Sequence, residues 1–402
     1  MKIKDFSTTH LNKLIPFVEL FSKALSFISV IIITRLLSVE SFGVYYYIIS
    51  IVAWASVFMD GGISYYIINK SVKDDISNLG EYLVSRVLFS LITIIFLCVV
   101  AGFIKQQYVL YILLYGLSFL FILLTAFFKI IARTQGKVTL DFTTIIAEPL
   151  IRVVVLIVLY FTVLNISLTL VFTVLLFTAL VGFVLSFFYF KNQIPLKINP
   201  KIEFQKTLAI LKETKWYLLM YLFLVGLKRV EIVILKFRFN DYESGLYSSA
   251  DNFYNSAYLF FTALILVGIK KHFSADNIRK RKNTLYLIGL SLLSVMVLYF
   301  FSDIFYTLFY SVEYLEGHHL LSILALSLLF SPFNYYFILK NNYNHNINVN
   351  IRVLGISFFI KIVLLFFADN VIMFSYLVVA TDLIILIAYY VLSLKKGTNL
   401  NR

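Results

Sequence analysis

The chain has 402 residues, of which 61% are hydrophobic and only 14% are charged. This composition indicates an integral membrane protein and excludes a soluble globular fold. The formal net charge of +14 does not indicate nucleic-acid binding, because the basic residues are spread over short loops and form no compact domain.

Long apolar runs fill the chain almost from end to end. A helix needs about 20 apolar residues to cross the hydrocarbon core of a bilayer. We predict spans at about 14–34, 44–69, 82–104, 108–128, 140–163, 166–190, 216–237, 245–269, 284–308, 320–339, 350–368 and 371–394. The sequence therefore predicts an all-α membrane protein with about twelve transmembrane helices in two six-helix bundles around a central cavity.

Basic residues are distributed unevenly between alternate loops. With the N-terminus placed inside, the tails and even-numbered loops hold most of the 35 lysines and arginines. The odd-numbered loops hold only Arg35, Lys105, Lys236 and Arg238. Because basic residues are retained on the cytoplasmic side of a membrane, this pattern predicts an even number of spans and two cytoplasmic termini.

The longest inside connection, about 191–215, lies at the middle of the chain. Pro195 and Pro200 interrupt its first part, and its second part has the pattern of an amphipathic helix. We interpret it either as a helix on the inner leaflet or as a solvated tether. In both interpretations it joins an N-terminal bundle, 1–200, to a C-terminal bundle, 201–402.

A weak internal repeat agrees with two related halves. At an offset of 202 residues, Gly43 aligns with Gly245 and Tyr45 aligns with Tyr247. Two six-span repeats with the same orientation predict a substrate path between the halves.

Charged residues inside the predicted spans need a physical explanation, since an ionisable group in hydrocarbon costs at least a few kcal/mol. Glu19 and Lys23 are four residues apart, as are Glu148 and Arg152, so each pair shares one helix face. The acids that we expect to line the cavity, or to carry H⁺ or Na⁺ for coupling, are Glu19, Asp60, Glu148, Glu231, Asp251 and Asp382. Structural ion pairs and helix-helix hydrogen bonds are the alternative explanations.

Cations inside the spans suit an anionic substrate. Arginine binds two phosphate oxygens with its forked guanidinium, and lysine acts as a point charge. The candidates for binding a diphosphate are Lys23, Arg152, Lys228, Arg229 and Lys361. The sequence predicts no catalytic residue, no metal site and no cofactor, and it contains no G-x-x-x-x-G-K-[ST] motif for nucleotides.

Several segments resemble the polysaccharide flippases, the Wzx-type transporters of O-antigen and capsule repeat units. TRLLSVESFGVYYYIISIVAW (34–54) and MDGGIS (59–64) resemble the start of that family. ESGLYSSA (243–250) and LFYSVEYLEGHHLLSILALS (308–327) resemble its later elements, although Ser38, Gly61 and Ser311 differ from the usual residues.

The resemblance implies the fold of the multidrug/oligosaccharidyl-lipid/polysaccharide exporter superfamily. It also implies a substrate, an oligosaccharide on undecaprenyl diphosphate that moves from the inner to the outer leaflet of the bacterial plasma (inner) membrane. Expected partners are this lipid-linked oligosaccharide, membrane lipids and a downstream glycan polymerase machinery. A multidrug or cation antiporter of the same superfamily is the alternative. An integral-membrane glycan polymerase is a weaker one, because the outer loops are short.

Overall fold

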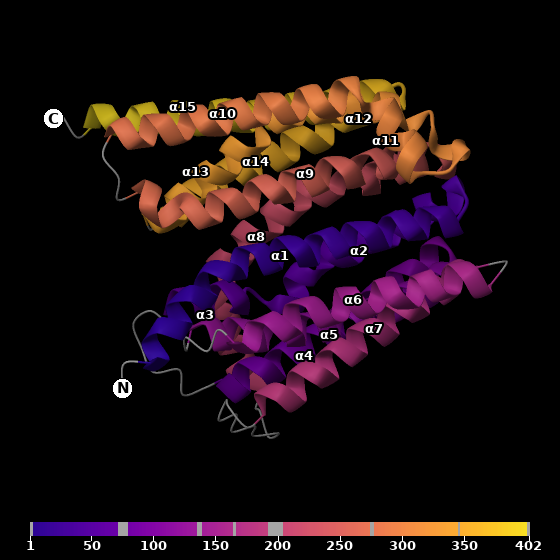
Figure 1. Cartoon of the computed structure of the whole chain (residues 1–402), viewed down its shortest axis with the longest axis horizontal. Coiled ribbons are helices and arrows are strands. Elements are labelled where there is room, and N and C mark those ends of the chain that lie inside the picture. Colours follow the sequence, from indigo (N-terminus) through magenta and orange to yellow (C-terminus); the bar gives the residue numbers. More distant parts are fainter. Residues whose placement is uncertain are drawn as a thin grey trace. The chain divides into compact units, whose positions relative to one another are not determined.

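The computed structural model describes residues 3–70, 79–134, 139–163, 166–191, 204–273, 277–344 and 346–399. All regular structure in these ranges is helical (Figure 1). The elements are α1 (Ile3–Leu36), α2 (Val39–Asp60), α3 (Ile63–Lys70), α4 (Leu79–Ile104), α5 (Gln106–Thr134), α6 (Thr139–Thr162), α7 (Leu168–Phe190), α8 (Phe204–Arg238), α9 (Asp241–Phe273), α10 (Asn277–Phe300), α11 (Ser302–Phe309), η1 (Val312–Tyr314), α12 (Gly317–Ala325), η2 (Leu326–Leu329), α13 (Ser331–Tyr343), α14 (Ile347–Phe366) and α15 (Val371–Asn399).

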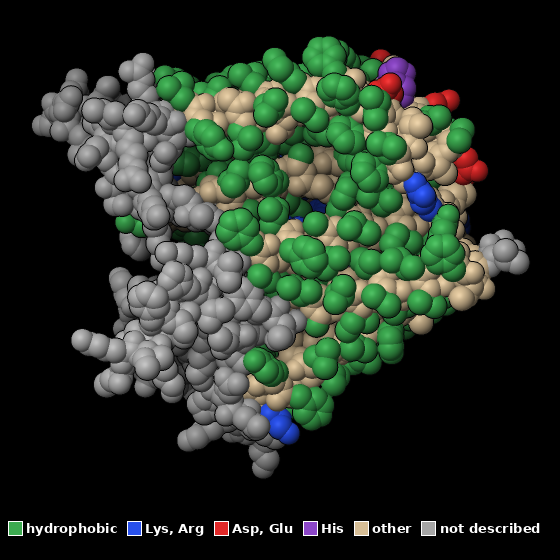
Figure 2. Space-filling view, in the orientation of Figure 1, with side chains coloured by type: hydrophobic (Ala, Val, Ile, Leu, Met, Phe, Trp, Pro, Cys, Tyr) green, Lys and Arg blue, Asp and Glu red, His purple; other side chains and the backbone are tan. Residues whose placement is uncertain are grey.

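Most of these helices are long and apolar enough to cross a membrane. Nine candidate spans pass this test among the described residues, and α10 with α11 forms a tenth that is bent by 66°. The helices α8 and α9, with 35 and 33 residues, are also long enough, and both carry charged residues within their length. Figure 2 shows hydrophobic side chains over most of the described surface on its visible face. The chain is therefore a multi-span helical membrane protein.

The helices form two compact units. The N-terminal unit consists of Met1–Leu36 and Ile48–Val225, and the C-terminal unit consists of Leu37–Tyr47 and Gly226–Arg402. The main boundary thus falls inside α8, later than the predicted division at residue 200. The predicted amphipathic helix is the first part of α8, and its Thr207, Ile210 and Thr214 are buried. Residues 192–203 of the predicted linker lie outside the described residues.

In the N-terminal unit, α5 packs against α4, α6 and α7, and α1 packs against α6. Its core is rich in aromatic side chains, including Phe127, Phe128 and Phe190. The outward face of α4 carries Ile95 and Phe103, which are 63% and 88% exposed. Such exposure suits contact with lipid tails, where apolar side chains meet no water.

In the C-terminal unit, α9 packs against α12 and α13, and α15 packs against α12, α13 and α14. The helix α10 also packs against α12. Side chains from four helices, α8, α9, α13 and α15, meet in one group of polar residues that is described below.

The repeat is visible where α2 and α9 begin. A Cβ atom on Gly43 would lie 2.3 Å from the Asp241 carbonyl oxygen, and one on Gly245 would lie 2.0 Å from the Val39 carbonyl oxygen. The offset of 202 residues that relates Gly43 to Gly245 also relates Val39 to Asp241, so the two contacts are equivalent. Only glycine allows the two helix starts to approach this closely.

The turns before these two helices follow the same relation. Ser38 Oγ accepts a hydrogen bond from the Ser41 backbone N–H at 3.3 Å, and Asn240 Oδ1 accepts one from the Glu243 N–H at 2.8 Å. Serine and asparagine are both preferred as N-caps because their side-chain oxygens accept such bonds. The structure therefore supports the predicted repeat.

Two spans differ in shape from the prediction. The predicted run 44–69 is broken at Gly61 and Gly62, which have φ values of 60° and 74° and separate α2 from α3. The predicted run 284–308 bends at Phe301, between α10 and α11. Left-handed backbone requires glycine in the first case, whereas no proline or glycine stands at the second.

Candidate functional site

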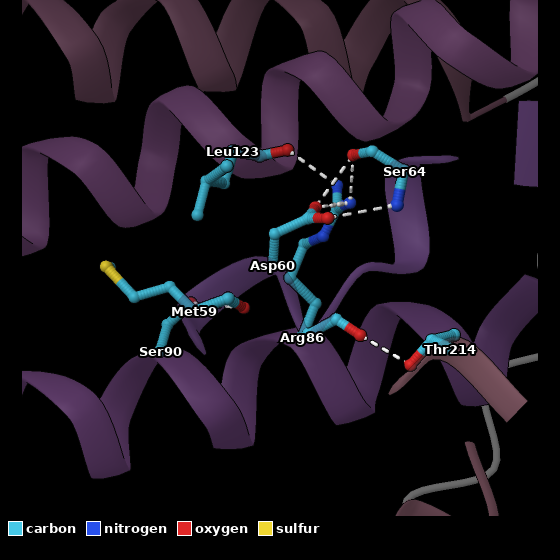
Figure 3. Close-up of polar contacts among 8 residues, drawn as sticks. Met59, Asp60, Ser64, Arg86, Ser90, Leu123 and Thr214 are labelled. Carbon is cyan, nitrogen blue, oxygen red and sulfur yellow. Dashed lines mark hydrogen bonds and ion pairs between the residues drawn. The ribbon is translucent and has the colours of Figure 1, made fainter. Parts of the chain in front are cut away.

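The N-terminal unit contains a buried ion pair at the glycine break after α2. Arg86 of α4 forms a salt bridge with Asp60, and both side chains are almost completely buried. The Arg86 Nη1 also donates to the Leu123 carbonyl oxygen of α5 at 3.0 Å. Figure 3 shows the Arg86 guanidinium between Asp60, Ser64 and Leu123. One arginine thus connects α2, α4 and α5.

Asp60 also fixes the start of α3. Its Oδ2 accepts a hydrogen bond from the Ser64 backbone N–H at 3.1 Å, and its Oδ1 accepts one from Ser64 Oγ at 2.7 Å. These bonds satisfy donors that the first turn of a helix leaves unpaired. The sequence offered Asp60 as a cavity or coupling acid, and the structure places it in a capping and ion-pairing position.

The first part of α8 is held at the same break. Thr214 Oγ1 donates to the Gly61 carbonyl oxygen at 2.6 Å. A Cβ atom on Gly62 would lie 3.0 Å from the Leu218 backbone nitrogen. The glycine turn therefore needs its small residues both for its positive φ and for the close approach of α8.

The two charge pairs that a four-residue spacing predicts lie on α1 and on α6. Glu148 and Arg152 form the expected salt bridge, and their side chains are 17% and 16% exposed. Lys23 is half-buried and lies within electrostatic range of Glu19. Ser22 Oγ donates to the Ile145 carbonyl oxygen at 2.9 Å, which ties α1 to α6 beside both pairs.

The C-terminal unit holds a second buried ion pair. Lys361 of α14 forms a salt bridge with Glu231 of α8, and its Nζ also donates to the Leu227 carbonyl oxygen at 2.8 Å. The Tyr247 hydroxyl donates to Glu231 Oε2 at 2.6 Å. Lys361 is 2% exposed and Glu231 is 5% exposed. Both ends of this pair are therefore supplied with additional hydrogen bonds, as a stable buried pair requires.

Asp251 of α9 lies close to Arg229 in the same unit. It accepts hydrogen bonds from the Tyr46 hydroxyl at 3.1 Å and from Asn255 Nδ2 at 2.6 Å. Arg229 lies within electrostatic range of both Asp251 and Tyr46. Tyr46 comes from the first turns of α2, which belong to this unit.

Lys228 has aromatic partners. Its Nζ donates to the Tyr254 hydroxyl at 3.0 Å and lies 4.1 Å from the centroid of the Tyr258 ring. The Tyr254 hydroxyl donates to Asp382 Oδ2 at 3.3 Å, and Asn334 Nδ2 donates to the Asp382 carbonyl oxygen at 2.9 Å. The unit thus brings Lys228 and Asp382, far apart in sequence, to one place.

Within each unit the described structure brings the predicted cations near acids. Glu148 and Glu231 form salt bridges with Arg152 and Lys361, and Asp251 lies within electrostatic range of Arg229. The charges of these groups are largely balanced, so an entering anion has to compete with a resident carboxylate. Whether these cations bind substrate remains a prediction, and so does a coupling role for the acids.

Arg86 is the main polar residue that the sequence analysis did not propose. It lies within the predicted span 82–104, but no acid stands three or four residues from it. Its partner, Asp60, lies on another helix, and only the packing of α2 against α4 brings them together. The signal available in the sequence was that two opposite charges were each without a partner in their own span.

The sequence of residues 14–269 matches the family model described as polysaccharide biosynthesis protein. No curated protein sequence is similar enough to count as a match.

Three solved structures share the fold. The lipid II flippase MurJ in an inward closed conformation is 16% identical, with a TM-score of 0.67, over 97% of this chain and 87% of that one. An inward-facing multidrug resistance MATE family transporter of the MOP superfamily is 13% identical, with a TM-score of 0.65, over 96% of this chain and 99% of that one. MATE in complex with MaL6 is 13% identical, with a TM-score of 0.62, over 98% of this chain and 97% of that one.

Proposed function

Because the chain belongs to the polysaccharide biosynthesis protein family, we propose that it is a flippase for lipid-linked glycans. The substrate is an oligosaccharide repeat unit, of O-antigen or capsule, on undecaprenyl diphosphate. The protein moves it from the inner to the outer leaflet of the bacterial plasma membrane by alternating access. The family match carries this proposal, and the fold shared with a lipid II flippase supports it.

Twelve spans with both termini in the cytoplasm complete the proposed layout. The nine candidate spans and the bent pair of α10 and α11 account for ten, and α8 and α9 add two. A helix that carries charged residues can still cross a membrane when those residues have partners within the protein. The salt bridge of Glu231 with Lys361 and the hydrogen bonds of Asp251 provide such partners.

The predicted phosphate ligands differ in their access to a substrate. Arg152 is 16% exposed in its side chain, and Lys23 and Arg229 are half-buried. Lys361 is 3% exposed in its side chain and already contacts a carboxylate and a carbonyl oxygen. Lys23, Arg152 and Arg229 are therefore the candidates for direct contact with the diphosphate. Lys361 is then a positioning residue, which holds the Glu231 side chain in place and does not contact the diphosphate.

The alternative is a multidrug antiporter, since transporters of that kind share the fold. Such a protein would have to offer acids to a cationic substrate. The acids of the described spans instead lie beside resident lysines and arginines. This balance opposes a free cation as much as a free anion, so the family match is what favours the glycan substrate.

Reconstituted transport distinguishes the two functions. Purified protein is placed in vesicles that contain a fluorescent undecaprenyl-diphosphate oligosaccharide, and a glycosidase is added outside to cleave only the outer-leaflet pool. The proposal predicts cleavage beyond the half that is initially accessible, with wild-type protein and not with empty vesicles. A matched vesicle experiment follows the efflux of a lipophilic cation dye. Dye transport without glycan transport would favour the antiporter and contradict the proposal.

A further inference from the structure

The Lys228 ammonium is enclosed by tyrosine side chains inside the C-terminal unit. Its Nζ lies 5.1 Å from the centroid of the Tyr254 ring and 4.1 Å from the centroid of the Tyr258 ring. Tyr258 packs edge-to-face against Tyr335 of α13, with ring centroids 6.4 Å apart. The face of an aromatic ring attracts a cation within about 6 Å of its centroid. Tyr258 therefore presents its ring face to the ammonium group, and Tyr254 presents its hydroxyl.

A carboxylate lies behind one of these rings. The Tyr254 hydroxyl receives a hydrogen bond from Lys228 and donates one to Asp382 Oδ2. Asn334 is bound to the Asp382 backbone, and its buried Oδ1 accepts no hydrogen bond from any described residue. Asp382 and Asn334 are each 6% exposed. The enclosure thus contains the π face of Tyr258, the hydroxyl oxygen of Tyr254 and a negative charge, and a spare amide acceptor lies next to it.

These groups are those that recognise an organic ammonium ion. Lys228 differs here from Lys361, whose Nζ contacts a carboxylate and a carbonyl oxygen. Among the described residues, the Lys228 Nζ reaches no carboxylate directly and depends on the tyrosines. The lysine therefore occupies the enclosure as a ligand would, through its cationic end.

We propose that the C-terminal unit contains an organic-cation site that the chain fills with its own Lys228, and that Lys228 thereby excludes cationic substrates from this unit. The tethered ammonium competes at a high effective concentration, because its stem holds it next to the rings. This inference goes beyond the proposed glycan transport. It assigns to one residue the rejection of cations by a chain that shares its fold with multidrug transporters.

The test uses a molecule that replaces the missing part of the side chain. Lys228→Ala removes three methylene groups and the ammonium, which together correspond to n-propylammonium. We expect n-propylammonium to raise the melting temperature of the purified Lys228→Ala protein in a saturable way and to leave that of the wild type unchanged. 1-Propanol, which has a similar size and no charge, should not stabilise the variant.

Two further variants control for the role of the rings and of the space. Lys228→Met keeps a long apolar stem in place and should show no response to n-propylammonium. Lys228→Ala/Tyr258→Leu keeps the space and loses one ring face, so its apparent affinity should fall about tenfold relative to Lys228→Ala. If Lys228→Ala is recovered only as aggregate, its monodisperse yield with n-propylammonium or with 1-propanol in the purification buffers becomes the measurement.

An equal effect of n-propylammonium on Lys228→Ala and the wild type would overturn the inference. Equal yields with the ammonium and with 1-propanol would do the same for an aggregating variant. These results are independent of glycan transport by the wild type. Failure of glycan transport would contradict the proposed function and leave the cation site standing.

Discussion

The buried pair of Asp60 and Arg86 gives the sharpest prediction of stability. Arg86→Met keeps an unbranched apolar stem and removes the guanidinium. The change deletes the salt bridge and the hydrogen bond to Leu123 O, and it leaves the Asp60 carboxylate buried without its cation. Ser64 still donates to Asp60 through its N–H and its hydroxyl. Two hydrogen bonds of this kind do not replace the missing charge.

The expected loss follows from the burial of both partners. Breaking a buried pair by removing one partner costs about 3–5 kcal/mol, because a buried charge remains uncompensated. Since Arg86 is 0% exposed and Asp60 is 2% exposed, water cannot supply the missing solvation without a rearrangement of α2 and α4. Asp60→Asn/Arg86→Met removes both charges. We expect this double variant to be more stable than Arg86→Met alone.

The free energy of unfolding is measured by titrating sodium dodecyl sulfate into the protein in mixed micelles, with tryptophan fluorescence as the signal. Arg152→Met at the partly exposed Glu148 pair is the matched control, and its loss should be smaller, since partial solvation weakens an ion pair. A loss below about 1 kcal/mol for Arg86→Met would show that the pair contributes no more than an exposed ion pair does, contrary to its burial.

Three further predictions concern the glycine contact of the repeat, the buried Lys361 and the candidate phosphate ligand Arg229. Gly245→Ala should destabilise the protein by about 1–3 kcal/mol, as overpacking does, because its Cβ would lie 2.0 Å from a backbone oxygen, and Gly43→Ala should have a similar effect; thermal unfolding of both variants checks this. Lys361→Met should be destabilising, and Lys361→Met/Glu231→Gln should recover part of the loss; equal melting temperatures for the single variant and the wild type would contradict a buried pair. Arg229→Gln should abolish glycan export in cells while the protein still inserts in the membrane, as followed by surface glycan staining and by immunoblotting of membranes; normal export from a well-inserted variant would exclude this arginine as a diphosphate ligand.

Hydrophobic pattern predicted most of the helices, because lipid demands an apolar surface along each span. The predicted span 371–394 closely matches the apolar part of α15, and 166–190 matches α7. The pattern could not reveal the bend at Phe301, since both sides of it are equally apolar. It also could not show that α8 continues from Phe204 without a break, because lysines in its first part obscure the start of the span.

The candidate site was predicted in part, and the limit was again physical. A spacing of four residues gave the pair of Glu148 and Arg152, since one helix fixes that contact. Lys361 and Glu231 lie 130 residues apart, and only the packing of α14 against α8 joins them. The aromatic enclosure of Lys228 was missed for the same reason. Its tyrosines belong to a chain so rich in tyrosine that no single one stands out.

Deleting the gene in its host and finding which leaflet then holds the lipid-linked glycan distinguishes a flippase from the other functions. A glycosidase or lectin that reaches only the outer face of the membrane measures this distribution. If the protein is the flippase, complete repeat units accumulate on the inner face and surface glycan is lost. The wild-type gene then reverses the accumulation and restores the surface glycan. Single units accumulating on the outer face would indicate a polymerase instead, and an unchanged distribution in both leaflets would contradict a flippase function.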